Sequence, residues 1–476
     1  MNPLDKFQTS KASISTHFAS ARVREAILAM GLIASPCGLV SAQNIEWLRN
    51  RSDANNGDVA WPLVVATDGN SNAVVAGSVK IPPHTTNSFL VKYTSDGTIA
   101  WERLGLDECL CDVQAWDVSE TDSIGNTFVN GLASRNLPSP RTTALTAKYS
   151  PSGDVDWISE YDNEERPFKK RKTLTVGDDG SVYVGGSYLE GLRLMKIGPD
   201  GTQQWIADYP GFTLDTSSIE GAAIDSEGNI QVTGNIVDLQ SGYSFAWHTL
   251  SYSPDGELRW ARRSDEQSFF GGWGWRVRLT SGGAVLVGGN SSDSSGVSAM
   301  RIIKYDGVGN DLWATNISSA PGVANWLDDL VVDHVGNSYV IGWVDDLERR
   351  WTISKVNSNG SHEWQIISLV SSQVSYAPKQ IAIDPSGNVI ASGSALHDGT
   401  HDFAIMKITP GGEVVWTAWY GGENGDSNAM YSALGPSGAI YVTGYLNAWR
   451  PDSVITTVKF RNRPLLSASP QYAHPR

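Results

Sequence analysis

The sequence predicts an all-β protein, a β-propeller whose eight four-stranded blades form a closed ring. Three observations lead to this prediction. A Gly-containing turn followed by Trp recurs along the chain, a second Gly-containing hairpin precedes each copy, and the last copy lacks a strand that the N-terminal region could supply. The 476 residues, which include 18 Trp and 48 Gly, would ordinarily suggest several domains. A unit of about 52 residues that cannot bury both of its faces alone indicates a single ring instead.

One hairpin of the repeat ends in the tryptophan. In segments such as K-Y-T-S-D-G-T-I-A-W, Gly stands four residues and Lys nine residues before Trp, a spacing typical of two short strands joined by a tight turn. One copy has Ser251 in place of Lys. The tryptophans are Trp101, Trp157, Trp205, Trp260, Trp313, Trp364 and Trp416, and the glycines are Gly97, Gly153, Gly201, Gly256, Gly309, Gly360 and Gly412.

Another hairpin precedes each of these and ends in its own repeat glycine. Asp often opens its turn, as at Asp333 and Asp384, because this side chain can accept hydrogen bonds from backbone N–H groups. Flanking segments such as Y-V-T-G-Y have the composition of strands. The repeat glycines are Gly77, Gly131, Gly186, Gly234, Gly289, Gly342, Gly393 and Gly444.

The two ends of the repeat region complete each other. The last unit contains three strands, the third at 453–460, and then has neither Gly-turn nor Trp. An isolated Ile45-Glu46-Trp47 stands near the start of the chain. We therefore expect the N-terminal strand to complete the last blade, which closes the ring and removes the open sheet edges. The propeller domain is expected to span 43–460.

The repeated text D-x-x-G-N-x-x-V-x-G followed by K-Y-x-x-x-G-x-x-x-W resembles the SBBP family of bacterial β-propeller repeats, over 45–460. The name of that family refers to seven blades, whereas eight units are counted here. The Gly-x-x-x-Trp spacing is also similar to that of the eight-bladed quinoprotein propellers. That second resemblance implies that Trp47 and the seven later repeat tryptophans pack between neighbouring blades, and it implies no chemistry.

Both ends of the chain are expected to lie outside the ring. Basic residues up to Arg24, an apolar run from Ala26 to Val40 and the small residues Ser41-Ala42 predict a signal peptide at 1–42. An N-terminal anchor is the alternative, but the apolar run is short and contains Pro36. The mature protein is then secreted, periplasmic or on the cell surface, with no transmembrane segment. Residues 461–476 are predicted to be a disordered tail.

Charge argues against one class of partner. The formal net charge is −15, whereas a nucleic-acid-binding protein needs a basic surface. The basic run Lys169–Lys172 shares its loop with acidic residues, which indicates a solvated loop. We expect a monomer with no cofactor and no nucleic-acid partner.

Function is expected on the loops that vary between repeats. The tight turns share one face of the ring, and the irregular loops share the other, called here the variable-loop face. Aromatic residues in and beside these loops could bind a carbohydrate or a protein, or could simply pack the loops. The candidates are Trp116, Phe269, Phe270, Trp273, Trp275 and Trp326, with Trp343 and Trp419 in comparable places.

The sequence therefore predicts an exported binding module without assigned catalytic residues. The alternatives are a polysaccharide lyase or hydrolase that uses paired carboxylates (Asp328-Asp329 or Asp345-Asp346) and a scaffold protein of the envelope.

Weaker candidates are a metal at His397 and His401 and a strained disulfide between Cys109 and Cys111. The repeat lysines are expected to be solvated or to protect strand edges.

Overall fold

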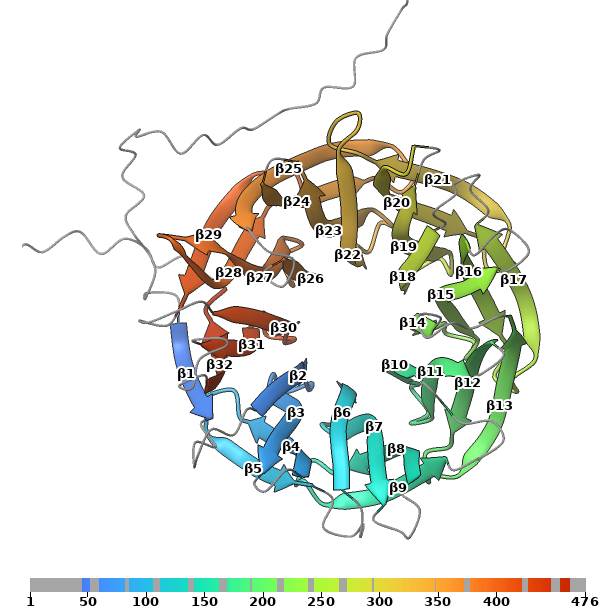
Figure 1. Cartoon of the computed structure of the whole chain (residues 1–476), viewed down its shortest axis with the longest axis vertical. Helices are drawn as coiled ribbons and strands as arrows, with labels where there is room; N and C mark the ends of the chain where they lie inside the picture. The colour runs from blue at the N-terminus through green and yellow to red at the C-terminus, as the bar shows by residue number, and fades with distance from the viewer. Residues whose placement is uncertain are drawn as a thin grey trace, which may run out of the picture.

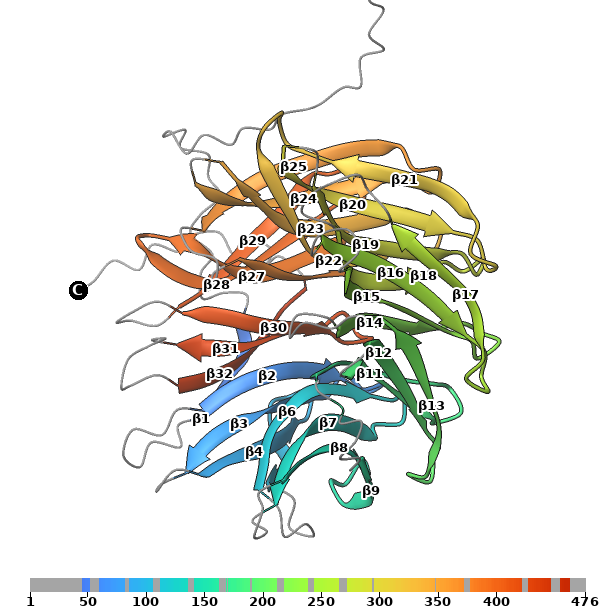
Figure 2. The same ribbon diagram turned by 45° about the vertical axis from the view of Figure 1, so that its right-hand side comes forward.

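The computed structural model shows 32 strands in eight separate four-stranded antiparallel sheets, arranged as blades around a central axis (Figures 1 and 2). This confirms the predicted eight-bladed β-propeller. The described residues are 45–51, 60–81, 85–105, 112–135, 141–161, 168, 170–188, 191–211, 218–238, 244–264, 272–292, 295–346, 348–371, 377–421, 427–446 and 454–462. The expected signal peptide, Cys109, Cys111 and the tail from 463 lie outside them.

Each of the first seven blades takes four consecutive strands, the first of which lies nearest the axis (Figure 1). Blades 1 to 4 are formed by β2(Ala60–Thr67), β3(Ala73–Ile81), β4(Thr85–Tyr93) and β5(Ile99–Leu104); β6(Asp112–Thr121), β7(Thr127–Arg135), β8(Arg141–Tyr149) and β9(Val155–Tyr161); β10(Lys170–Val176), β11(Val182–Tyr188), β12(Gly191–Ile197) and β13(Gln203–Pro210); β14(Ser218–Ile224), β15(Ile230–Asp238), β16(Ser244–Tyr252) and β17(Leu258–Ser264).

Blades 5 to 8 follow in the same order. They are formed by β18(Gly272–Leu279), β19(Val285–Ser292), β20(Ser298–Tyr305) and β21(Asp311–Ile317); β22(Ala324–Val332), β23(Ser338–Asp345), β24(Arg349–Val356) and β25(His362–Ser371); β26(Pro378–Ile383), β27(Val389–His397), β28(Thr400–Ile408) and β29(Val414–Tyr420); β30(Asn428–Leu434), β31(Ile440–Leu446), β32(Val454–Phe460) and β1(Ile45–Arg51).

The N-terminal strand closes the ring as predicted. β1 pairs antiparallel with β32, with Trp47 opposite Lys459 and Arg51 opposite Ile455. The last blade therefore joins the two ends of the described chain, and both edges of its third strand are hydrogen-bonded. A change in β1 acts on the whole ring because no other described strand can take its place.

Tryptophan docking connects the blades. Seven repeat tryptophans donate an indole hydrogen bond to a carbonyl in the next blade's second turn, at 2.9–3.3 Å. The turn glycine must approach the ring closely, since a Cβ atom at Gly309 would lie 2.7 Å from Trp260 Cδ2. Gly309 also has φ +85°, so both its conformation and its contact exclude a side chain. Trp416 faces the blade without this turn, and its Nε1 has no acceptor among the described residues.

The expectation that the repeat lysines are solvated is wrong for Lys92, Lys196, Lys407 and Lys459, which are buried. Lys92 is 3% exposed, lies 2.9 Å from Asp68 Oδ2 in its own blade, and donates a 3.0 Å hydrogen bond to Gly125 O in the next. An ammonium group can be buried here because a carboxylate and a carbonyl satisfy it. Lysine therefore links blades, a role that spacing alone does not reveal.

A β-bulge in the first strand of every blade explains the other repeat glycine. The residue paired with that glycine is followed by one unpaired residue, which is always the fourteenth before the glycine. A Cβ atom at Gly342 would lie 1.7 Å from Trp326 O, so the bulge requires glycine. The bulge residues are Leu63, Asp117, Lys172, Glu220, Trp275, Asp328, Lys379 and Met430.

Candidate functional site

Four half-buried tryptophans form a continuous row on the variable-loop face, which we call the tryptophan ladder: Trp275, Trp273, Trp326 and Trp343. The ring centroids of Trp275 and Trp273 lie 6.5 Å apart, those of Trp273 and Trp326 lie 6.2 Å apart, and those of Trp326 and Trp343 lie 5.5 Å apart. The last two pairs are stacked.

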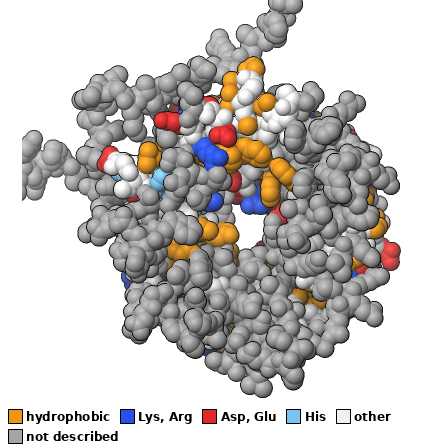
Figure 3. Space-filling view, viewed as in Figure 1, with side chains coloured by type: hydrophobic (Ala, Val, Ile, Leu, Met, Phe, Trp, Pro, Cys, Tyr) orange, Lys and Arg blue, Asp and Glu red, His pale blue; other side chains and the backbone are white. Residues whose placement is uncertain are grey.

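The positions of these rings follow from strand direction. Trp273 and Trp326 lie near the starts of β18 and β22, and Trp343 is the register partner of Trp326 near the end of β23. In Figure 3, hydrophobic side chains gather at the rim of the central opening over β18 and β22. The ladder thus joins blades 5 and 6 at the face where the irregular loops begin.

The side chain of Arg349 lies over the last ring of the ladder, Trp343. The guanidinium carbon of Arg349 lies 4.6 Å from the Trp343 ring centroid, close enough for a cation–π interaction. Asp345 holds the same arginine at 3.7 Å, and Asp346 pairs with Arg350. The carboxylates at 345 and 346, considered above for catalysis, are therefore engaged by arginines.

The structure brings three of the six aromatic candidates together: Trp273, Trp275 and Trp326. Trp116 lies in β6, but its side chain is outside the described part, as are Phe269 and Phe270. The sequence reasoning missed Arg349, which carries no motif. Two indole nitrogens of the ladder, Trp275 Nε1 and Trp326 Nε1, are buried without a hydrogen-bond partner among the described residues.

The histidine candidates take part in local contacts. His397 Nδ1 lies 3.1 Å from Asp402 Oδ2, and its ring stacks on Trp419 with centroids 4.6 Å apart. His401 is buried in β28. No group of three His, Cys, Asp or Glu side chains that could hold a metal ion occurs among the described residues.

Asp328 and Asp329 lie in contrasting environments because the bulge separates their directions. Asp329 accepts hydrogen bonds from Arg276 Nε at 2.9 Å, Arg278 at 3.3 Å and Ile381 N at 3.1 Å, and so links blades 5, 6 and 7. Asp328 is the bulge residue, and burial raises its pKa to about 7 although Lys379 and Arg276 lower it. Its Oδ2 has no hydrogen-bond partner within the described ranges.

A second carboxyl with an elevated pKa lies on the innermost strand of blade 2. Burial raises the pKa of Glu120 to about 7, while a backbone hydrogen bond from Val176, the charge of Arg278 and a hydrogen bond from Thr175 lower it. Glu120 and Arg278 occupy the same position in their blades, three residues after the bulge. The side chain of Arg278 is 38% exposed, so solvent reaches this position on the innermost strand of its blade.

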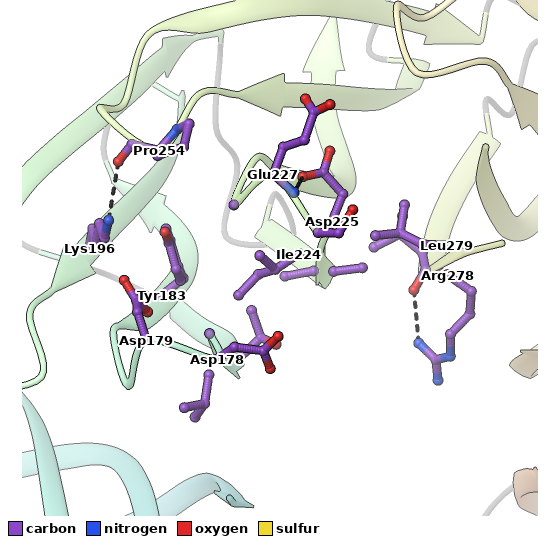
Figure 4. A pocket seen from close by; sticks show the side chains of 18 residues that line it. Asp178, Asp179, Tyr183, Lys196, Ile224, Asp225, Glu227, Pro254, Arg278 and Leu279 are labelled. Carbon is purple, nitrogen blue, oxygen red and sulfur yellow. Dashed lines mark hydrogen bonds between the residues drawn. The ribbon is translucent and has the colours of Figure 1, made fainter. Parts of the chain in front are cut away.

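The tight-turn face is also hollowed. A pocket of about 740 Å³ is lined by turns of blades 3 and 4 and by Arg278 (Figure 4). Its carboxylates mostly stabilise their own turns. Asp225 accepts hydrogen bonds from Asn229 N at 2.9 Å and Glu227 N at 3.0 Å, and Asp179 accepts one from Ser181 N at 2.9 Å. Two carboxylates of this pocket, those of Asp179 and Asp225, are therefore engaged by their own turns.

Comparison with known proteins supports the fold. Sqt1 of Chaetomium thermophilum superimposes with a TM-score of 0.50 at 9% identity, over 84% of this chain and 95% of that chain. Weaker similarities are to the quinohemoprotein alcohol dehydrogenase ADHIIG of Pseudomonas putida HK5 (TM-score 0.49, 11% identity, 93% and 80% of the chains) and to the polysaccharide lyase Uly1 (0.47, 9%, 88% and 99%). The likeness shows the fold alone.

No family model matches the chain, and no curated protein sequence matches it significantly. The resemblance to the SBBP repeats thus remains a prediction beyond the eight-bladed fold. In the described part of the chain, no helix is long and apolar enough to cross a membrane.

Proposed function

We propose that the protein is an exported binding module that takes a glycan on its variable-loop face, with the tryptophan ladder as the contact surface. The observation that supports this most is the clustering of four half-buried indoles from two blades, ended by Arg349. Indole rings combine a large apolar area with an N–H donor, which suits ligands that have apolar and hydroxyl-bearing surfaces.

The packing of the ladder supports a role beyond stability. A side chain that serves only the core usually has its buried donors paired. Trp275 Nε1 and Trp326 Nε1 are unpaired within the described residues, whereas seven of the eight docking tryptophans donate to a carbonyl and Trp416 alone of these does not. The ladder and the docking ring therefore use the same residue type in different ways.

The test is glycan binding by the full mature protein and its variants. Trp273→Ala and Trp326→Ala should each weaken binding about tenfold or more, equivalent to about 1.4 kcal/mol. Trp419→Ala is the matched control, because Trp419 is a half-buried indole on the same face that stacks on His397 and not on the ladder. A screen of neutral and acidic oligosaccharides without binding, or equal losses in all three variants, would reject the proposal.

A second candidate function rests on Asp328. A carboxyl with a pKa of about 7, two residues from Trp326, has the properties of a general acid in glycan cleavage. An enzyme of this kind would release new reducing ends from a polysaccharide, and Asp328→Asn would abolish that activity while binding to the ladder persists. Binding without turnover at any pH from 5 to 9 would exclude this candidate.

A further inference from the structure

The tryptophan ladder runs between positively charged side chains. Arg349 lies over Trp343 at one end, with its guanidinium carbon 4.6 Å from the ring centroid. At the other end Trp275 is the bulge residue of blade 5, and the bulge residues of the next two blades are Asp328 and Lys379. In Figure 3, Lys and Arg side chains border the hydrophobic group at the central opening. Cations therefore flank the aromatic surface, although the chain carries a net charge of −15.

The three bulge residues lie at one level of the ring, because each is the fourteenth residue before its repeat glycine. Trp275, Asp328 and Lys379 thus form an arc along the innermost strands of blades 5, 6 and 7. Asp328 lies within electrostatic range of Lys379 and of Arg276, the residue after Trp275. The arc therefore begins with an indole of the ladder and ends with an ammonium group.

Lys379 is the less compensated cation of this arc. It is half-buried, and it makes neither a hydrogen bond nor an ion pair with a side chain in the described part of the chain. The carboxyl that acts on it there is that of Asp328, whose pKa burial raises to about 7. Asp328 is then only partly ionised at neutral pH and compensates Lys379 incompletely. Arg276, by contrast, donates a 2.9 Å hydrogen bond to Asp329.

Arg349 at the other end of the ladder is also loosely held. Asp345 lies 3.7 Å from its Nε, beyond hydrogen-bond distance, and is 46% exposed. The guanidinium group of Arg349 donates no hydrogen bond within the described residues. The neighbouring Arg350 differs, because it donates one to Asp346. Arg349 can therefore offer its N–H groups to an anion while it stays over the indole ring.

We propose that the ligand of the ladder is an acidic glycan, an oligosaccharide with carboxylate or sulfate groups, and that Lys379 and Arg349 bind these groups at the two ends of the aromatic row. The inference rests on the glycan-binding function proposed above and specifies its ligand. Charge-assisted hydrogen bonds from ammonium and guanidinium groups to such oxygens are stronger than those between neutral groups. The indoles contact the apolar parts of the sugar rings, and the cations select for charge.

The test compares acidic oligosaccharides with their own uncharged forms. Oligogalacturonides and their methyl esters supply the carboxylate pair, and sulfated galactan oligosaccharides and their desulfated forms supply the sulfate pair. Titration calorimetry of the mature protein at fixed ionic strength gives each Kd. Wild type should bind at least one acidic form about tenfold more tightly than its uncharged form, and the pair that shows this difference identifies the anion.

Three charge-removing substitutions locate the effect. Lys379→Gln and Arg349→Gln should each raise the Kd for the acidic form about fivefold or more and leave the Kd for the uncharged form within about twofold. Arg350→Gln is the matched control, since it removes the same charge one residue away from a side chain that Asp346 already pairs, and it should change either Kd less than about twofold. Trp273→Ala should weaken the binding of both forms.

The outcomes separate this inference from the function on which it rests. Equal binding of acidic and uncharged forms by the wild type would overturn the inference and leave glycan binding by the ladder standing. Equal losses in Lys379→Gln, Arg349→Gln and Arg350→Gln would also overturn it, because they would reflect net charge alone. Absence of binding to every form would reject both.

Discussion

Two glycines of blade 5 offer a direct measurement of how much tryptophan docking contributes to stability. Gly283 and Gly309 both lie in tight turns with left-handed backbone, at φ +76° and +85°. A Cβ atom at Gly283 would meet nothing within 4 Å, whereas one at Gly309 would lie 2.7 Å from Trp260 Cδ2 and 2.9 Å from Cγ. Alanine at the two positions therefore has the same backbone effect and a different steric effect.

The magnitudes follow from these contacts. A non-glycine residue in the left-handed region costs about 1–2 kcal/mol, partly offset by the lower entropy of the unfolded alanine chain. Gly283→Ala should thus lower the free energy of unfolding by about 1 kcal/mol. Gly309→Ala also forces the Trp260 ring to move, and overpacking of this kind costs about 1–3 kcal/mol more.

Urea denaturation followed by far-UV circular dichroism measures both variants. A double-mutant cycle adds the decisive comparison, because in a Trp260→Ala background the steric part should vanish and Gly309→Ala should cost about as much as Gly283→Ala. If Gly309→Ala and Gly283→Ala differ by less than about 0.5 kcal/mol in the wild-type background, the ring contact does not matter and the docking argument fails.

Three further predictions concern the same structure. Trp416→Phe should cost about 1 kcal/mol less than Trp260→Phe, because the Trp416 N–H has no acceptor among the described residues whereas Trp260 donates to Gly307 O; equal midpoints in urea would contradict this. Deletion of residues 45–51 should abolish cooperative folding of the ring rather than trim one end, which thermal unfolding and proteolysis would detect. The pKa of Glu120 rises from 4.5 to about 7 on folding, so the stability that its protonation contributes is complete below pH 4.5 and is lost as the pH rises through 7. Between pH 4.5 and 8 the free energy of unfolding of the wild type should therefore fall by up to about 3 kcal/mol more than that of Glu120→Gln. Parallel curves of unfolding free energy against pH would refute this.

The repeat made most of the fold predictable. The spacing between Gly97 and Trp101, and its copies, marks the hairpins because the turn glycine and the strand tryptophan recur at fixed positions in each repeat. The segment that begins at Ile45 is recognisable from the sequence as the missing strand because the last unit lacks one. The prediction is wrong for four repeat lysines because their partners are distant in the sequence. Lys92, for example, is buried through contacts with Asp68 and with Gly125 of the next blade.

The site was predictable only in part. The aromatic residues of the variable loops identify Trp273, Trp275 and Trp326 as candidates. They do not predict the cation–π contact between Arg349 and Trp343. The positions of the bulge residues follow a regular spacing, fourteen residues before each repeat glycine. The reason for that glycine is visible only in the paired strands, where Gly342 closely approaches Trp326 O.

The sequence by itself therefore determined the number of blades, the strand order within each and the closure of the ring, because these depend on local turns and on regular spacing. The tertiary structure alone decided which charges are compensated. Nothing in the repeat marks Arg193 as paired, and only the opposite strand shows that Asp208 accepts hydrogen bonds from its Nε and Nη2. Charge compensation depends on distances of a few ångströms between residues on different strands, and such distances are set by packing.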